Sequence, residues 1–380
     1  MTRRFLPKFF LLPYGTLPKA SALFLTLLLF SGCAAETISS AAPSGETAMQ
    51  SQPSQSSSET AALPQENTEI RDGTHERTLA TPPDFPESYN YGSGRYTDWG
   101  SGSMNRRLPL PQGNATVLNT APVLTGIQAL YLWEEGNFPA QTEVTTANFD
   151  PVDFRPYLTA IPVREGTEAK GAVVLLAGGA FQVRGNYTDT LPTAAHLREL
   201  GYQTFIVDYR LRPYTQEEGA LDVARAVRFI RKNAGIYGID PNDIAVMGYS
   251  AGGIQAGEFF LHYDEDVLPT ALDPDYIPDE LDEVSAHASA CGMIYSFYGR
   301  LSVASMDEEA LRAGALPPTF YCYGAEDPFY RQFEAQYSLM QDVGISTRRI
   351  VLQDWPHGFG GDGGWVEDYA QWLEQVFSLN

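Results

Sequence analysis

Residues 244–253 read IAVMGYSAGG. The apolar run that opens this stretch predicts a short buried strand, and the apolar-periodic segment that follows it predicts a helix. Ser250 lies at the tight turn between them, with one glycine two residues before it and another two residues after it. Glycines at these positions leave room for a turn that forces the serine hydroxyl out of the sheet edge. The stretch therefore predicts a nucleophilic serine between a strand and a helix.

The chain around this turn alternates between strand and helix patterns. A repeated order of strand, helix and strand requires a mostly parallel sheet with helices on both faces. In such a sheet, ligands bind at the carboxyl ends of the strands. The helix predicted at 219–234 ends before Gly235. The predicted strands are 127–133, 157–163, 172–176, 203–209, 244–247, 289–295, 319–323 and 349–352, and the other predicted helices are 189–200, 330–343 and 365–377.

A second glycine-bearing turn follows the strand predicted at 172–176. Residues 177–181 read AGGAF, and two glycines at a strand's carboxyl end let the backbone turn its amides outward. Amides placed in this way stabilise the negative charge of an acyl intermediate, whereas the alternative is a plain turn into the next helix. Together with the serine turn, this loop is interpreted as an oxyanion hole.

A serine nucleophile needs a base, and the base needs a group that orients it. The chain has five histidines, and only His357 lies on a loop flanked by glycine and proline after a late strand. Asp327 lies at the end of another predicted strand; its alternative role is a helix cap, and Glu326 is its rival as the acid. We therefore predict Ser250, Asp327 and His357 as a catalytic triad.

The chain order of nucleophile, acid and base is that of the α/β-hydrolases, and longer motifs extend the resemblance. These motifs are the stretches LLAGGAF, VDYRLRP, ALDVARAVRFIRKNAGIYGIDPNDIAVMGYSAGG, YGAEDPF and WPHGFG. In them the chain is similar to the acetyl-xylan esterase and feruloyl-esterase-like group, close to the hormone-sensitive-lipase group. The resemblance covers about residues 125–380 and implies an α/β-hydrolase fold.

The resemblance also implies an activity and a set of site residues. It implies a serine carboxylesterase that acts on acylated plant polysaccharide fragments. The chain departs from the family at Ala177, where the family often has histidine, but backbone amides do not depend on that side chain. The implied roles are Ser250 as nucleophile, Asp327 as acid, His357 as base, and the amides of Gly179, Ala180 and Ala251 as oxyanion donors.

Two other functional classes remain open. One is a serine peptidase of the prolyl-oligopeptidase kind, whose catalytic domain shares this strand order but whose propeller domain has no counterpart in this sequence. The other is a non-catalytic, tethered glycan-binding lipoprotein with a relic triad. The three intact triad positions favour an enzyme over the second class.

The amino-terminal residues predict export. Basic residues precede the uncharged apolar run 21–30, which is too short to span a membrane and is typical of a secretory signal. Ser31, Gly32 and Cys33 then resemble the lipobox of bacterial lipoproteins. We predict a signal peptide at residues 1–32 and a lipid on Cys33 that anchors the protein to the membrane surface of a bacterial envelope; ordinary cleavage after Ala34 or Ala35 is the alternative.

The chain after the signal peptide predicts a tether followed by one domain. Residues 34–82 are rich in Ser, Thr, Gln, Glu, Pro and Ala and have few large apolar residues with which to build a core. We therefore predict a disordered tether over residues 33–90, an unassigned segment over 91–124 and the catalytic domain over 125–380. The acidic segment 264–283 is predicted to be a solvated loop, with a cap as the alternative.

Charge and cysteine usage narrow the possible partners. A formal net charge of −22 argues against nucleic acid, because the protein's field would repel a polyanion. Of three cysteines, Cys291 and Cys322 lie in apolar runs and are predicted to be buried free thiols. No C-x-x-C or H-E-x-x-H spacing occurs, so neither a metal nor a cofactor is predicted.

Overall fold

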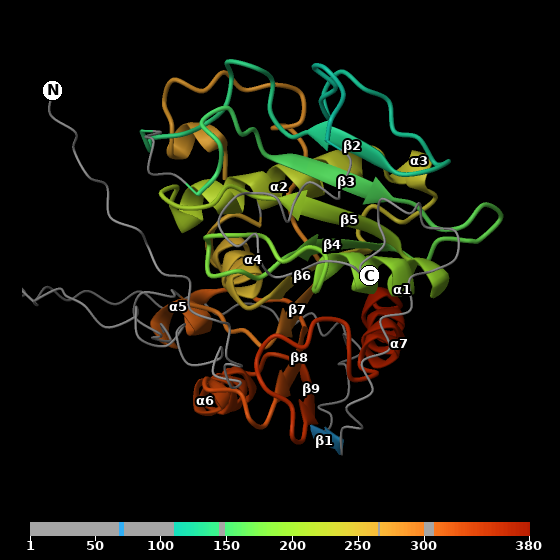
Figure 1. The fold of residues 1–380 in the computed structure, drawn as a ribbon, viewed down its shortest axis with the longest axis vertical. Helices are drawn as coiled ribbons and strands as arrows, with labels where there is room; N and C mark the ends of the chain where they lie inside the picture. The colour runs from blue at the N-terminus through green and yellow to red at the C-terminus, as the bar shows by residue number, and fades with distance from the viewer. Residues whose placement is uncertain (1–67, 72–109, 144–148, 265–266, 300–307) are drawn as a thin grey trace, which may run out of the picture. The chain divides into compact units, whose positions relative to one another are not determined.

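The structure is a computed structural model that describes residues 68–71, 110–143, 149–264, 267–299 and 308–380. Nine strands of these residues form one sheet (Figure 1). In chain order they are β1 (Thr68–Arg71), β2 (Gln128–Tyr131), β3 (Tyr157–Ile161), β4 (Ala172–Leu176), β5 (Gln203–Asp208), β6 (Ile244–Tyr249), β7 (Ala290–Ile294), β8 (Thr319–Gly324) and β9 (Thr347–Leu352).

The spatial order of the strands is β1-β9-β8-β7-β6-β4-β5-β3-β2. In this order, each pair of neighbouring strands from β1 to β5 is parallel. At the other edge, β3 pairs antiparallel with both β5 and β2. The predicted mostly parallel sheet is confirmed, and the first two predicted strands, 127–133 and 157–163, correspond to its antiparallel edge. The serine strand β6 lies near the centre of the sheet, between β4 and β7, so the loops after β4 and β6 lie next to each other.

Helices cover both faces of the sheet, as predicted. Helices α1 and α7 pack together on one face, and α2 and α4 pack together on the other (Figure 1). The helices within the described residues are α1 (Thr190–Glu199), α2 (Gln216–Lys232), α3 (Ala234–Tyr237), α4 (Ala251–His262), α5 (Glu308–Ala313), α6 (Tyr330–Asp342) and α7 (Val366–Phe377), together with the short 3₁₀ helix η5 (Pro269–Ala271).

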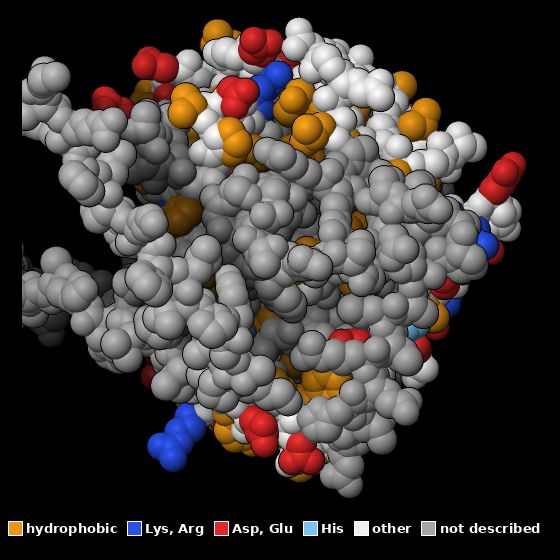
Figure 2. All heavy atoms as spheres, viewed as in Figure 1, with side chains coloured by type: hydrophobic (Ala, Val, Ile, Leu, Met, Phe, Trp, Pro, Cys, Tyr) orange, Lys and Arg blue, Asp and Glu red, His pale blue; other side chains and the backbone are white. Residues whose placement is uncertain are grey.

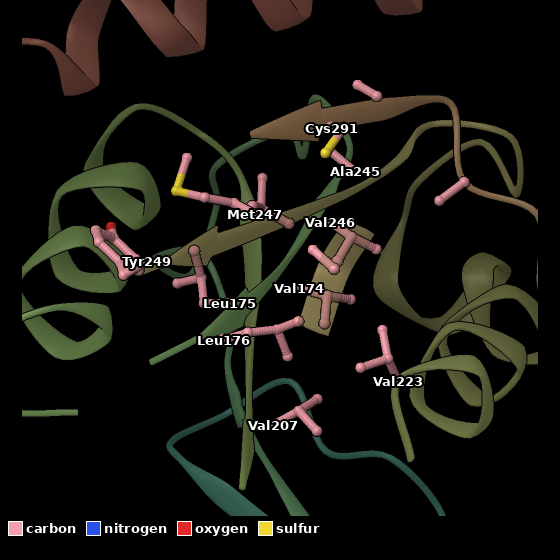
Figure 3. Packing of buried hydrophobic residues seen from close by; sticks show 14 of the residues in the cluster. Val174, Leu175, Leu176, Val207, Val223, Ala245, Val246, Met247, Tyr249 and Cys291 are labelled. Carbon is pink, nitrogen blue, oxygen red and sulfur yellow. The ribbon is translucent and has the colours of Figure 1, made fainter. Parts of the chain in front are cut away.

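The core follows from the continuous apolar runs of the central strands. Every residue of β4 and β6 is buried, which is the pattern of strands that are covered on both faces. Figure 3 shows Val174 of β4 and Val246 of β6 on the side of Val223 from α2. Cys291 and Cys322 are buried and free, so the prediction for both thiols is confirmed.

The bounds of α2 differ from the prediction at both ends. The helix begins at Gln216, because Thr215 and Glu218 form a capping box in which each side chain bonds the other's backbone amide. Gly235 was predicted to end the helical segment, but it lies inside the short helix α3. The residue that ends this segment is Gly238, which adopts a left-handed conformation at φ 67°.

The described part of the acidic segment 264–283 is irregular except for η5, and it is not simply solvated. Asp279 and Asp282 accept hydrogen bonds from Arg225 and Arg228 of α2, at 2.7 Å for Asp279 and 3.4 Å for Asp282. Arg225, Arg228 and Asp282 are buried. Most of the described segment is an irregular loop with exposed residues, as predicted, but the expectation that it is solvated is wrong at Asp282, because hydrophobic patterning does not show which arginines of a helix have partners.

The amino-terminal predictions are only partly within the described residues. Thr68–Arg71 falls in the predicted tether but forms β1 against β9, and Arg71 pairs with Asp368 at 2.6 Å. The tether prediction is wrong at these four residues. They form a strand because β9 offers an unpaired edge, and the composition of the tether cannot show that such an edge exists elsewhere in the chain. The predicted signal peptide, Cys33 and the rest of the tether lie outside the described residues.

Part of the predicted unassigned segment also packs on the sheet. In residues 110–124, Val117 is buried and its amide donates to the carbonyl of Tyr131 at 2.8 Å.

The surface of the described residues carries acidic side chains around the edge of the face in Figure 2. Among the helices that the structure describes, none combines the length and the apolar content needed to cross a bilayer.

Candidate active site

Ser250 occupies the sharp turn between β6 and α4. Its backbone lies at φ 47° and ψ −118°, a conformation that non-glycine residues rarely adopt and that costs about 1–3 kcal/mol. The flanking glycines are required by space. A Cβ atom on Gly248 would lie 2.2 Å from the carbonyl oxygen of Gly252, and one on Gly252 would lie 2.1 Å from that of Leu176. The predicted strand, turn and helix around the serine are confirmed.

Three side chains from separate loops form one chain of hydrogen bonds. Nε2 of His357 lies 2.8 Å from Oγ of Ser250, and Nδ1 of His357 lies 2.6 Å from Oδ2 of Asp327. The Asp327 side chain is fully buried, while a quarter of the His357 side chain is exposed. His357 therefore lies between the buried carboxylate of Asp327 and the hydroxyl of the partly exposed Ser250.

The geometry separates Asp327 from its rival Glu326. Asp327 Oδ1 accepts the Phe329 amide at 2.8 Å, which leaves Oδ2 to His357. Glu326 is exposed, and its amide donates to the Trp355 carbonyl at 3.0 Å. Asp327 does not cap α6, whose N-cap is Phe329, so its alternative role as a helix cap is wrong and its contact with the histidine is the one predicted for the acid.

The glycine-bearing loop after β4 lies beside the serine. A Cβ atom on Gly178 would lie 3.1 Å from the Cβ atom of Ser250. Gly179 and Ala180 both have positive φ, at 133° and 56°, which turns this loop sharply. Among the loop and turn hydrogen bonds of the described residues, none uses the amide of Gly179, Ala180 or Ala251 as donor.

Ala177 opens this loop in place of the histidine that the family often has. Its carbonyl accepts a hydrogen bond from the buried hydroxyl of Tyr209 at 2.7 Å. The loop is therefore held from β5 through its backbone. Tyr209 follows β5 directly, so the VDY motif places the tyrosine at the neighbouring strand end.

Sequence reasoning did not single out the aromatic and acidic residues that surround His357. The ring centroid of Tyr295 lies 4.9 Å from that of His357, and the ring of Phe329 lies at 5.7 Å. Asp189, predicted only as the first residue of a helix, is buried under the loop after β4 and accepts the Gly178 amide at 2.8 Å. The sequence signal for these residues is only their place at the ends of strands or helices.

The fold and the position of the site define the class of protein. A mostly parallel sheet with an antiparallel edge, a serine turn after a central strand and the acid and histidine on later loops give this chain the α/β-hydrolase fold. Residues 161–312 match the family model described as BD-FAE. The resemblance to α/β-hydrolase esterases predicted from the sequence is thus confirmed.

The relatives of this chain are ester hydrolases and xylan-related enzymes. The acetylxylan esterase of Xylanibacter ruminicola is 25% identical over 222 residues, 54% of this chain and 45% of that protein. A probable carboxylic ester hydrolase of Mycobacterium tuberculosis is 30% identical over 124 residues, 32% of this chain and 27% of that protein. The chain therefore spans less than half the length of these curated relatives.

A solved structure shares the fold. It is the acetyl ester-xyloside bifunctional hydrolase from Caldicellulosiruptor lactoaceticus, with a TM-score of 0.51 and 21% sequence identity. The match covers 71% of this chain and 97% of that chain. At this identity the likeness concerns the fold, and it agrees with the α/β-hydrolase architecture.

Proposed function

We propose that this protein is a serine carboxylesterase that removes acetyl or feruloyl groups from plant polysaccharide fragments. The observation that carries the proposal is the hydrogen-bonded series from Asp327 through His357 to Ser250, on a serine held in a strained turn. Strain of this kind persists where the surrounding structure enforces it, and it clusters at active sites. The relatives named above support ester bonds as the target.

The geometry supports a two-step reaction through an acyl-enzyme. Oγ of Ser250 attacks the ester carbonyl carbon while its proton passes to Nε2 of His357. The carbon–oxygen bond to the alcohol breaks, and the leaving oxygen takes that proton. Water then attacks the acyl carbon, gives a proton to His357, and the serine leaves with that proton as the carboxylic acid is released. Asp327 holds Nδ1–H and stabilises the imidazolium in both steps.

The oxyanion donors in this proposal are the amides of Gly179, Ala180 and Ala251. Preorganised amides act where negative charge develops on the carbonyl oxygen, and they contribute most in a site that excludes water. The loop turn at Gly179 and the start of α4 at Ala251 both lie beside Ser250. The substrate class in this proposal rests on the family resemblance and on the relatives.

The test is hydrolysis by purified wild type and Ser250→Ala of acetylated xylo-oligosaccharides, feruloylated oligosaccharides and prolyl peptides. We expect ester hydrolysis by wild type and a loss of about a thousandfold or more in the variant, because triad members act as a unit. Ser378→Ala, at an exposed position near the end of α7, is the control and should keep full activity. Cleavage of the peptides alone would favour the peptidase, and binding without turnover would favour the glycan-binding lipoprotein.

We further propose that a lipid on Cys33 anchors the enzyme to the membrane surface of a bacterial envelope. The support is the basic residues, the apolar run 21–30 and the lipobox-like Ser31–Gly32–Cys33. In detergent phase separation, wild type expressed in a bacterial host should enter the detergent phase, whereas Cys33→Ala should stay aqueous or keep its signal peptide. Wild type found wholly in the aqueous phase would contradict the anchor.

A further inference from the structure

We propose that Asp189 and Tyr295 form a positioning pair for His357. The pair links the loop 177–181 (the oxyanion loop) to the loop that carries His357 and Gly360 (the histidine loop), and it electrostatically supports the imidazolium of His357. Asp189 lies at the start of α1, and Tyr295 lies just after β7. Neither residue belongs to the predicted triad or to the predicted oxyanion donors. The inference rests on the proposed esterase function and names two further residues for it.

The first observation is a continuous series of hydrogen bonds. The Gly178 amide donates to Oδ2 of Asp189 at 2.8 Å, and the Tyr295 hydroxyl donates to Oδ1 of Asp189 at 2.9 Å. The Tyr295 hydroxyl in turn accepts the amide of Gly360 at 3.2 Å. One carboxylate and one phenol therefore join the loop that carries Gly179 to the loop that carries His357.

The second observation is the conformation of Tyr295. Its φ is 37°, which is uncommon for a bulky residue and stores about 1–3 kcal/mol of strain. This conformation comes with edge-to-face contacts between its buried ring and both His357, at 4.9 Å, and Phe359, at 4.7 Å. The tyrosine is thus positioned to orient the imidazole ring as well as to bind Asp189.

The third observation is the close contact between the segment of Asp189 and the histidine loop. Gly360 has φ 61°, and a Cβ atom there would lie 2.1 Å from the carbonyl oxygen of Thr188. Gly360 is three residues after His357, and Thr188 directly precedes Asp189. A shift of the Asp189 segment would therefore be transmitted to the histidine loop.

The hydrogen bonds of Asp189 fit an ionised carboxylate. Both of its oxygens accept, and the Thr188 hydroxyl is a third neighbour at 3.2 Å. Burial raises the pKa of Asp189, and the Gly178 and Tyr295 donors oppose this rise. Burial raises the pKa of Tyr295 well above its usual range, so its hydroxyl stays protonated and remains a donor.

The imidazole of His357 has charged and titratable neighbours from several elements. Asp327 bonds Nδ1, the Ser250 hydroxyl bonds Nε2, and Asp189 interacts electrostatically with His357. The buried phenols of Tyr209 and Tyr249 also interact electrostatically with Asp189, and because burial raises the pKa of both, both are neutral. The imidazolium that forms during the reaction therefore has two carboxylates near it, one in direct contact and one behind Tyr295.

The experiment compares Asp189→Asn and Tyr295→Phe with wild type in full pH profiles of kcat/KM for an acetylated substrate. Asp189→Asn removes the charge with little change of shape. We expect kcat to fall about 10- to 100-fold with KM within about threefold, because a shifted oxyanion loop weakens transition-state rather than substrate binding. The acidic limb of the profile should move to lower pH by about half a unit or more, because the imidazolium loses a stabilising negative charge.

Tyr295→Phe separates positioning from charge. It removes the bonds to Asp189 and Gly360 but leaves the carboxylate, so kcat should fall about 3- to 30-fold with a smaller movement of the acidic limb. Asp208→Asn is the matched control, since Asp208 is also fully buried but bonds Asn186 instead of the oxyanion loop. Its acidic limb should coincide with that of wild type.

The outcomes distinguish this inference from the proposed function. If Asp189→Asn and Tyr295→Phe are folded by circular dichroism and match wild type in kcat and in the acidic limb, the pair has no positioning role. If Asp189→Asn does not fold, an unchanged kcat in Tyr295→Phe still overturns the inference. Loss of ester hydrolysis in Ser250→Ala would stand in either case, whereas no hydrolysis by wild type would reject the proposed function itself.

Discussion

Two groups of buried carboxylates in this molecule have different partners. Near β5 and α2, Asp150 and Asp222 pair with buried arginines, Arg184 at 2.6 Å and Arg210 at 2.7 Å. At the candidate site, Asp327 faces His357 and the Phe329 amide, and Asp189 faces amide and hydroxyl donors. Among the described residues, neither of these site carboxylates forms an ion pair with lysine or arginine.

The partners of a buried carboxylate distinguish a structural charge from a functional one. A carboxylate that is paired with arginine has its charge neutralised at every pH at which the protein works. A carboxylate that faces histidine and neutral donors keeps its charge available for a cation that forms only during a reaction. Burial alone does not separate the two groups, because members of both are fully buried.

The largest expected effect is at Asp327. Asp327→Asn should lower kcat by about a thousandfold to ten-thousandfold, because asparagine stabilises the wrong tautomer of the histidine, as in the serine proteases. Glu326→Gln changes the same charge on the adjacent, exposed residue and should keep at least half of the activity. Steady-state kinetics of both variants, side by side, check this prediction; a crippled Glu326→Gln with an active Asp327→Asn would reverse the assignment of the acid.

The next effect is on stability and belongs to the arginine-paired group. Arg210 donates Nε and Nη2 to Asp222 at 2.9 and 2.7 Å, and both side chains are fully buried. Arg210→Met should lower the free energy of unfolding by about 3–5 kcal/mol, because it leaves a buried charge without its partner. Urea denaturation measures this loss.

A double variant sharpens the same prediction. Asp222→Asn in the Arg210→Met background removes the uncompensated charge and should restore part of the lost stability. The Asn side chain keeps an oxygen for the Trp133 indole, which bonds Asp222 at 2.7 Å. A double variant no more stable than Arg210→Met would mean that the arginine acts through packing rather than through charge.

The smallest effect concerns Asp208, whose Oδ1 lies 3.9 Å from Nε of Arg184 and accepts a hydrogen bond from the side-chain amide of Asn186 at 2.9 Å. Burial raises the pKa of Asp208 to about 6, against the lowering effect of Arg184. Between about pH 4 and pH 6 the native state thus binds a proton that the unfolded state releases, so stability falls as pH rises through this window.

Asp208→Asn removes this titration. The difference in the free energy of unfolding between the variant and wild type should move in the variant's favour by ~3 kcal/mol from pH 4 to pH 7. Urea denaturation across this pH range measures the difference, with the exposed Asp342→Asn as the control. A constant difference would show that Asp208 keeps its charge throughout and belongs with the arginine-paired group.

Much of the fold was predictable because strand and helix patterns are local. The runs at 172–176 and 244–247 were identified as buried strands, and the helices at 189–200 and 330–343 were placed within one residue of their bounds. The ends of α2 were missed, since the capping box at Thr215 depends on a side-chain geometry that periodicity does not report. β1 was missed because its pairing partner, β9, lies almost three hundred residues away.

The candidate site shows the same division. The α/β class, the serine turn and the choice of Asp327 and His357 follow from the sequence alone, because glycines, strand ends and a scarce histidine are visible in one dimension. The arginine partners of the buried charges, the contact of the Asp279 segment with α2, and the link from Asp189 through Tyr295 to the histidine are visible only in the folded chain. These contacts join residues from separate elements, and their partners depend on side-chain directions and burial that only the packed chain fixes.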